Sequence, residues 1–180
     1  MNAVHTEAGS PSDWVQRWAH LVPPSGRVLD VACGRGRHAR YFAERGCSVT
    51  AVDRDADALA TLPAGIVACV ADLESAPWPL PGLAFGGVVV TNYLWRPLWP
   101  VLMQTLEPGG VLICETFALG QAIFGRPTNP DFLLRPGELL EVCRDLHVVA
   151  YEDGVLDAPA RRIQRIAAVR APPQGASCRL

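Results

Sequence analysis

The chain has 180 residues, which suits one domain, and its 49% apolar content is enough to bury a substantial core. Charged residues make up only 19% and the net charge is -2, so the composition excludes a disordered chain and offers no basic stripe for nucleic acid. No apolar run approaches the roughly 20 residues that cross a bilayer, and the first residues lack the basic and apolar stretches of a signal peptide.

The cysteines and the basic residues exclude further kinds of functional site. The six cysteines include no Cys-x-x-Cys pair, and no cysteine and histidine have zinc-ligand spacing, so no metal site is expected. Most of them fall in or beside apolar runs, which is typical of small buried side chains in a reducing compartment and predicts a cytoplasmic protein. All 16 basic residues are arginines, which excludes a lysine base or Schiff base.

The first predicted element is a helix that begins after Ser10. Ser10 is expected to be the N-cap and Pro11 to take the first helical position. Trp14 and Trp18 then lie on one face of the helix, four residues apart. We expect this N-terminal helix, within residues 1–22, to close over the functional site.

Apolar runs and helical patterns then alternate along the chain. Short apolar runs predict strands at 27–32, 47–53, 65–71, 85–91 and 111–117. Helices are predicted at 37–45 and at 99–106. A short helix is predicted between them, with Asp55 as its N-cap and Leu62 as its last residue. The proline-rich residues 75–84 predict a loop in place of a helix.

The C-terminal part has a different pattern. A long loop at 118–134 is followed by a predicted helix near 136–144 and by two strands at 147–152 and 162–170. The two strands lack a helix between them, so we expect an antiparallel hairpin with Asp153-Gly154 in its connection. The chain is expected to form a single domain over 1–171, with a disordered tail at 172–180.

Alternating strands and helices indicate an α/β protein with a parallel sheet. The predicted fold is a Rossmann-like, doubly wound sheet of about seven strands. Five strands are parallel, the C-terminal hairpin is antiparallel, and helices cover both faces. In such sheets a ligand binds beyond the carboxyl ends of the strands.

Glycines and acids gather where this edge is predicted. Gly34 and Gly36 follow the first strand, where they let the backbone approach a ligand at the start of a helix. Asp30 lies inside that strand and could organise the glycine loop or attract a ligand ammonium. Asp53 ends the second strand, where a carboxylate can accept both hydroxyls of a ribose, and Asp72 ends the third, where it can accept an adenine amino proton.

The sequences VLDVACGRG (28–36), AVD (51–53), ADL (71–73) and LEPGG (106–110) together resemble the motif series of class I S-adenosylmethionine-dependent methyltransferases. The chain is also weakly similar to small bacterial methyltransferases of the tellurite-resistance type. This resemblance implies S-adenosylmethionine as the cofactor. The residues that it assigns to cofactor binding are Asp30, Ala32, Cys33, Gly34, Gly36, Asp53, Arg54, Asp72, Leu73 and Asn92.

The substrate half of the site is less specific. Tyr93 is a candidate to contact the methyl group, to accept a proton or to border the cofactor, and Glu115 is a candidate base or partner for a substrate amine. Arg96 and Arg126 could bind an anionic group of the acceptor, and Trp14 could cover it. His38, on the first helix after the glycine loop, could approach the cofactor carboxylate or a substrate, but it is expected to face solvent.

The implied reaction is an in-line displacement at a sulfonium methyl, for which the protein mainly positions the acceptor. The short chain favours a small-molecule acceptor, with neither nucleic acid nor membrane as partner. Asn92-Tyr93-Leu94-Trp95 departs from the Asn-Pro-Pro-aromatic motif of enzymes that methylate base amines. Three alternatives stay open: an NAD(P)-dependent oxidoreductase, a non-catalytic S-adenosylmethionine-binding protein, and an RNA methyltransferase that acts through a partner.

Overall fold

The structure is a computed structural model that describes residues 9–171. The predicted tail at 172–180, and the first eight residues of the predicted N-terminal segment, lie outside the described residues. Within the described part of the chain, no helix combines the length and the apolar character that are needed to cross a membrane.

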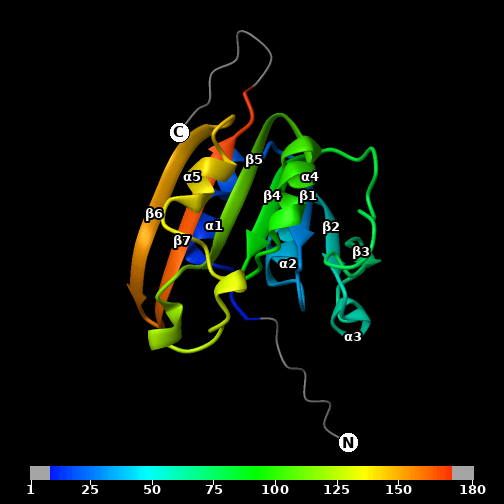
Figure 1. The fold of residues 1–180 in the computed structure, drawn as a ribbon. Coiled ribbons are helices and arrows are strands. Elements are labelled where there is room, and N and C mark those ends of the chain that lie inside the picture. Colours follow the sequence, from blue (N-terminus) through cyan, green and yellow to red (C-terminus); the bar gives the residue numbers. More distant parts are fainter. Residues whose placement is uncertain (1–8, 172–180) are drawn as a thin grey trace, which may run out of the picture.

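Seven strands form the centre of the molecule (Figure 1). Their bounds are β1 (Arg27–Val31), β2 (Ser48–Asp53), β3 (Val67–Val70), β4 (Phe85–Thr91), β5 (Leu106–Phe117), β6 (His147–Asp157) and β7 (Ala160–Val169). The α-helices are α1 (Asp13–Trp18), α2 (Arg37–Glu44), α3 (Ala56–Leu59), α4 (Trp99–Thr105) and α5 (Glu138–Val142). Four short 3-10 turns are η1 (Ala19–Leu21), η2 (Arg96–Leu98), η3 (Gln121–Ile123) and η4 (Pro130–Phe132).

The sheet has the order β3-β2-β1-β4-β5-β7-β6. The pairs β1–β2, β1–β4, β2–β3 and β4–β5 are parallel, whereas β7 runs antiparallel to both β5 and β6. This confirms the predicted architecture of five parallel strands and a C-terminal hairpin. Because chain order reverses at β1 and β4, the carboxyl ends of these strands form the switch point at which ligands bind.

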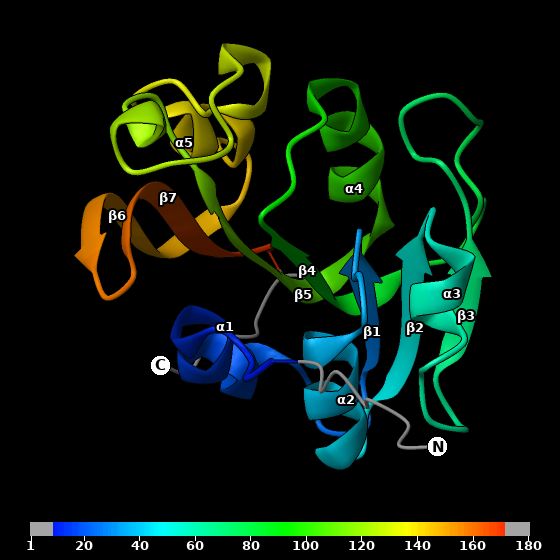
Figure 2. The same ribbon diagram turned by 90° about the horizontal axis from the view of Figure 1, so that it is seen from below.

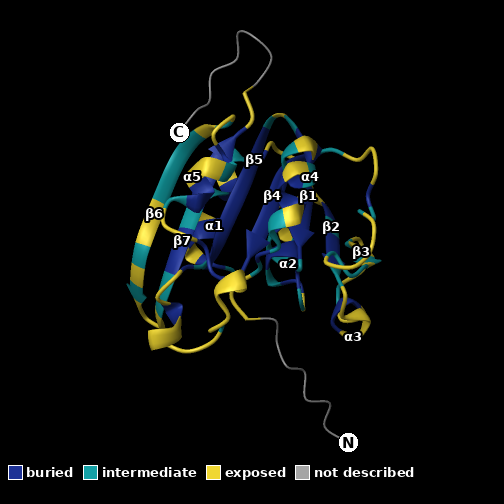
Figure 3. Cartoon of the chain, viewed as in Figure 1, coloured by how far each residue is buried: buried dark blue, intermediate teal, exposed yellow. Residues whose placement is uncertain are grey.

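Helices cover the two faces of the sheet in separate layers. Figure 2 shows α1 and α2 on one face and α4 and α5 on the other. Each layer has its own apolar core: Trp14 and Phe42 pack on the first face, and Leu102 and Leu139 on the second. The strand β4 is buried along its whole length between the two cores, which explains its unbroken apolar sequence (Figure 3).

The structure corrects two local predictions. The N-cap of α1 is Ser12, whose hydroxyl accepts the Trp14 N–H, and not Ser10. The hairpin turns at Ala158-Pro159, since Asp157 pairs with Ala160 and the expected turn at Asp153-Gly154 lies inside β6. The loop predicted for 75–84 is confirmed, because no helix or strand forms between β3 and β4.

Candidate functional site

Two residues with left-handed backbone mark the switch point. Ala32 has φ 50° directly after β1, and Asn92 has φ 54° directly after β4. Such conformations cost energy in residues with a Cβ, and they concentrate at ligand-binding sites. Ala32 and Asn92 both border cavities at the carboxyl edge of the sheet, so the two sharp turns shape the candidate site.

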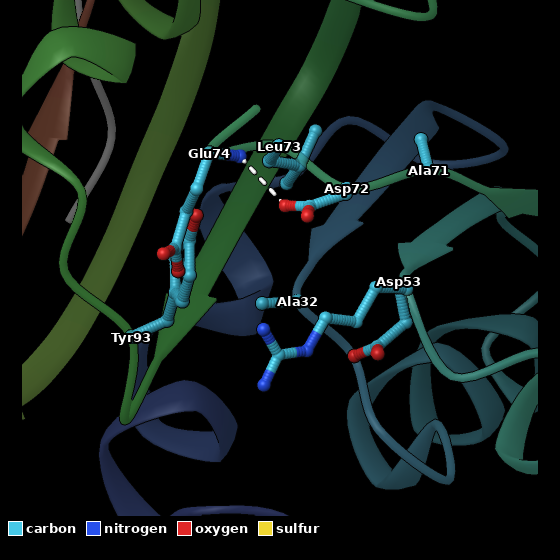
Figure 4. A pocket seen from close by; sticks show the side chains of 8 residues that line it. Ala32, Asp53, Ala71, Asp72, Leu73, Glu74 and Tyr93 are labelled. Atoms are coloured by element: carbon cyan, nitrogen blue, oxygen red, sulfur yellow. Dashed lines mark hydrogen bonds between the residues drawn. The ribbon is translucent and has the colours of Figure 1, made fainter. Parts of the chain in front are cut away.

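The first cavity, here the Asp53 cavity, lies beyond β2 and β3. Asp53 uses one carboxylate oxygen to accept the Gly34 N–H at 2.7 Å and the other to accept the Asp55 N–H at 2.9 Å. Each oxygen keeps a lone pair, so the carboxylate can still accept hydroxyl groups while it holds the glycine loop. Figure 4 shows the residues that border this cavity, which are Ala32, Asp53, Arg54, Ala71, Asp72, Leu73, Glu74 and Tyr93.

Asp72 is held in a fixed orientation at the edge of the same cavity. Its carboxylate accepts the Glu74 N–H at 3.0 Å and the Ser75 hydroxyl at 2.8 Å. These hydrogen bonds hold the pKa of Asp72 below its usual value, because they favour the charged form. Asp72 therefore presents an ionised hydrogen-bond acceptor at the edge of this cavity.

The second cavity, here the Gly34 cavity, adjoins the first at Ala32 and has a volume of about 360 Å³. A Cβ built on Gly34 meets no atom within 4 Å, so this glycine keeps open space for a ligand. Gly36 differs, since its Cβ would lie 2.2 Å from Leu62 Cδ2. The residues that border the cavity are Gly9, Ala32, Cys33, Gly34, Arg35, Arg37, His38, Thr91 and Asn92.

The third and largest cavity, here the Phe117 cavity, has a volume of about 570 Å³. It shares Glu74 and Tyr93 with the Asp53 cavity and Asn92 with the Gly34 cavity. Arg126 and Glu74 are the charged residues that border it. Its lining consists of Glu74, Asn92, Tyr93, Leu94, Phe117, Arg126, Pro127, Thr128, Asn129 and Phe132. The Asn92-Tyr93 turn is thus where all three cavities meet.

Tyr93 separates the Asp53 cavity from the Phe117 cavity. In Figure 4 its ring overlaps the side chain of Glu74, and both residues border the same two cavities. The hydroxyl is buried and has no hydrogen-bond partner among residues 9–171. Burial, reinforced by the nearby Glu74 and Asp72 carboxylates, raises the pKa of Tyr93 well above its usual value. The phenol is therefore protonated at neutral pH and can donate a hydrogen bond, but it is a poor base.

Most of the predicted cofactor residues meet at the cavities, but Asp30 and Gly36 do not border them. Asp30 lies behind the glycine loop and accepts the Ala39 N–H at 2.9 Å, so it anchors the start of α2. Its complete burial raises its pKa to about 7, although the Ala39 hydrogen bond opposes this shift. Gly36 is the left-handed N-cap of α2 and is needed for packing against Leu62.

The structure places two predicted substrate residues in the protein interior. Trp14 is 2% exposed and donates its indole N–H to the Ile166 carbonyl, so it packs the core and does not cover a ligand. Glu115 is 1% exposed and is held by Arg161 at 3.2 Å and Arg165 at 3.3 Å. Both arginines come from β7. Because the Glu115 carboxylate is paired with these two cations, it is not available as the base that the sequence suggested.

Arg96 also has a role other than the predicted one. Its guanidinium donates to the Glu138 carboxylate at 2.7 and 3.0 Å, and to the carbonyls of Asp131 and Leu133 at 2.7 and 2.9 Å. These bonds attach the 118–134 loop to η2 and α5, and Arg96 borders none of the three cavities. Of the two predicted substrate arginines, Arg126 alone faces the Phe117 cavity.

Two residues at the site, His38 and Glu74, were misjudged or missed from the sequence. His38 is buried and borders the Gly34 cavity with Thr91, although we expected it to face solvent. Its position on the apolar face of α2 with Ala39 and Phe42 was the signal. Glu74 reaches two cavities, and its place two residues after Asp72 could have indicated this. Within residues 9–171, no group of three His, Cys, Asp or Glu side chains is arranged to hold a metal ion.

Comparison with known proteins agrees with this geometry. Residues 28–110 match the family described as methyltransferase domain. The malonyl-[acyl-carrier protein] O-methyltransferase of Enterobacter lignolyticus (strain SCF1) is 35% identical over 106 residues, which cover 51% of this chain and 39% of that protein. The chain therefore spans well under half the length of this curated relative.

Solved structures share the fold over nearly the whole chain. TehB from Haemophilus influenzae superposes with a TM-score of 0.73 at 20% identity, covering 92% of this chain and 64% of that one. The glycopeptide N-methyltransferase MtfA, crystallised with S-adenosylmethionine, gives a TM-score of 0.62 at 21% identity, covering 96% and 100%.

The seven-stranded order and the glycine loop with its acidic partner define the class I methyltransferase fold. Residues 28–110, a little under half of the chain, are similar to the methyltransferase domain, and the fold is that of solved S-adenosylmethionine-dependent methyltransferases. The residues present fit this cofactor. Gly34 leaves open space where a Cβ would intrude, and Asp53 and Asp72 present carboxylates to the Asp53 cavity.

Proposed function

We propose that the chain transfers a methyl group from S-adenosylmethionine to a small-molecule acceptor that enters the Phe117 cavity. The observation that carries this proposal is the meeting of the three cavities at Asn92 and Tyr93. The Asp53 and Gly34 cavities are lined by residues of the predicted cofactor motifs, and the Phe117 cavity is free to hold a second molecule. Its volume of about 570 Å³ is within the range of small-ligand sites.

When bound, S-adenosylmethionine supplies a methyl group on a sulfonium, which is already activated for displacement. The residues of this chain then have to hold the acceptor in line and exclude water. Asp53 and Asp72 would hold the adenosine end, and residues of the Gly34 cavity the amino-acid end. The Asn92-Tyr93 turn would present the methyl group to the Phe117 cavity.

The lining of the Phe117 cavity suggests an acceptor with an apolar body and a polar end. Leu94, Phe117 and Phe132 supply apolar surface, while Arg126 and Glu74 supply one charge of each sign. Glu74 takes the role that the sequence suggested for Glu115, because it is the carboxylate that borders this cavity. It can bind an acceptor amine or remove a proton, whereas Tyr93 remains protonated and can position the acceptor by a hydrogen bond.

The test is transfer of label from methyl-labelled S-adenosylmethionine to a panel of small amines, carboxylates, thiols and phenols. We expect label on at least one class. With that acceptor, Glu74→Gln and Arg126→Gln should each lower kcat/KM about tenfold or more. Arg126 borders the Phe117 cavity and not the Asp53 cavity, so Arg126→Gln should leave affinity for S-adenosylhomocysteine unchanged. Glu141→Gln, an exposed charge change on α5, is the matched control and should leave both values unchanged.

The outcomes separate the alternatives. A chain that binds S-adenosylhomocysteine but labels RNA in preference to every small molecule would contradict the small-molecule proposal. A chain that binds it and labels nothing would favour a non-catalytic binding protein.

A further inference from the structure

A buried imidazole lies behind the Gly34 cavity. His38, on α2, is 1% exposed and sits between the segment that precedes α1 and the end of β4. The Ser12 N–H donates to His38 Nε2 at 3.1 Å, and His38 Nδ1 lies 3.3 Å from Thr91 Oγ1. Ser12 also donates its hydroxyl to Glu115 Oε1 at 3.1 Å. The imidazole therefore joins three elements that are distant in the sequence.

The Ser12 contact determines which ring nitrogen carries the proton. A backbone N–H can only donate, so Nε2 must be the unprotonated nitrogen. The ring is neutral, because burial lowers the pKa of His38 to about 3. Its single proton is then on Nδ1, and it is donated to Thr91 Oγ1.

This arrangement fixes the direction of the Thr91 hydroxyl. Since Oγ1 accepts from His38, the Thr91 proton has to point elsewhere. Among the residues that the structure describes, no side chain or carbonyl accepts this proton, and the Thr91 side chain borders the Gly34 cavity. A hydrogen-bond donor is thus available to whatever occupies the cavity.

The charges around the same cavity favour an anion. Arg35 and Arg37 border it, whereas no carboxylate does. The Gly34 cavity adjoins the Asp53 cavity at Ala32, so a ligand whose adenosine lies in the Asp53 cavity extends its other end here. In S-adenosylmethionine that end is an amino acid with a free carboxylate.

We propose that His38 is a positioning residue that directs the Thr91 hydroxyl to donate to the carboxylate of the cofactor. Ser12 supports this arrangement, because its N–H holds the imidazole in the required tautomer. Cofactor binding is thereby coupled to the packing of residues 9–12 against α2. Gly9, in this segment, borders the same cavity. The inference rests on the proposed function, since it assumes S-adenosylmethionine as the cofactor.

The experiment compares two ligands that differ at this end. The full chain and its variants are titrated with S-adenosylhomocysteine and with 5′-methylthioadenosine, which has no carboxylate. Thr91→Val should weaken S-adenosylhomocysteine binding roughly 10-fold to 100-fold, as expected for a hydrogen bond to a charged group. Its affinity for 5′-methylthioadenosine should stay within about twofold of the wild type. Thr91→Ser keeps the hydroxyl and should restore S-adenosylhomocysteine binding.

A second pair of variants tests His38 itself. His38→Asn can keep an N–H donor near the Nδ1 position, whereas His38→Leu removes it, and both remove the acceptor for the Ser12 N–H. The Asn variant should therefore bind S-adenosylhomocysteine more tightly than the Leu variant, with equal affinity for 5′-methylthioadenosine.

Equal losses for the two ligands in Thr91→Val, or no loss for either, would overturn the inference and leave the proposed function standing. A wild-type chain that binds neither ligand would instead contradict the proposed function, and the inference would fall with it.

Discussion

Replacing Gly36 with alanine tests whether this glycine is needed for packing of the fold, whereas Gly34 is needed to leave space for a ligand. Gly36 has φ 71°, and a Cβ there would lie 2.2 Å from Leu62 Cδ2. An alanine in left-handed backbone costs about 1 kcal/mol. The clashing atom is the end of the partly exposed Leu62 side chain, so turning it aside adds roughly 0.5–1.5 kcal/mol. We therefore expect Gly36→Ala to lower the free energy of unfolding by about 1.5–2.5 kcal/mol.

The control is Gly46→Ala, measured in the same urea unfolding experiment. Gly46 has φ 83° and open space around its Cβ position, so it incurs only the backbone cost of about 1 kcal/mol. Gly34→Ala should be similarly mild in stability but should lose S-adenosylhomocysteine binding, because its Cβ enters the Gly34 cavity. Equal destabilisation by Gly36→Ala and Gly46→Ala would refute the packing role of Gly36.

Three further predictions concern charged and titrating groups. Asp53→Asn should weaken S-adenosylhomocysteine binding at least about tenfold in calorimetry, with the exposed Asp57→Asn as an unaffected control. Between pH 6.5 and about 3 the unfolded chain binds a proton at His38 that the folded chain does not. The His38 contribution to stability, at most about 5 kcal/mol, is therefore lost as pH falls through this window, and His38→Asn should flatten the pH profile of urea unfolding. Glu138→Gln weakens the buried partner of Arg96, so acceptor KM should rise and stability fall by about 2 kcal/mol, while unchanged acceptor kinetics would contradict our account of the 118–134 loop.

The parallel half of the fold was predictable from local pattern. The apolar runs within β1, β2, β4 and β5 are short and alternate along the chain with helical patterns. Buried strands in a parallel sheet need apolar side chains on both faces, so their sequences are distinctive. Asp53 ends β2 and Asp72 comes two residues after β3, the neighbouring strand, which is why the structure brings them to one cavity.

The polar interior was not predictable, because it depends on contacts between distant segments. Glu115 looked available at the end of a strand, but Arg161 and Arg165 reach it from β7, about 50 positions further along the chain. His38 is buried because the segment at Ser12 folds back onto α2. Such pairing is set by tertiary packing, which overrides local exposure patterns.

The length of the β6–β7 hairpin could also not be predicted from the local sequence. The strands β6 and β7 continue through Asp153-Gly154, a sequence that is typical of turns. There, Glu152 and Asp153 face Arg165 and Gln164 across the two strands. Cross-strand pairing of this kind can extend a hairpin past a local turn signal.

We expect the groove formed by the Asp53 and Gly34 cavities to bind S-adenosylmethionine. The most direct test is calorimetric titration of the full chain with S-adenosylhomocysteine and, separately, with NADH. We predict binding of the first with a micromolar dissociation constant and no binding of the second. Binding of NADH alone would contradict the account and favour an oxidoreductase.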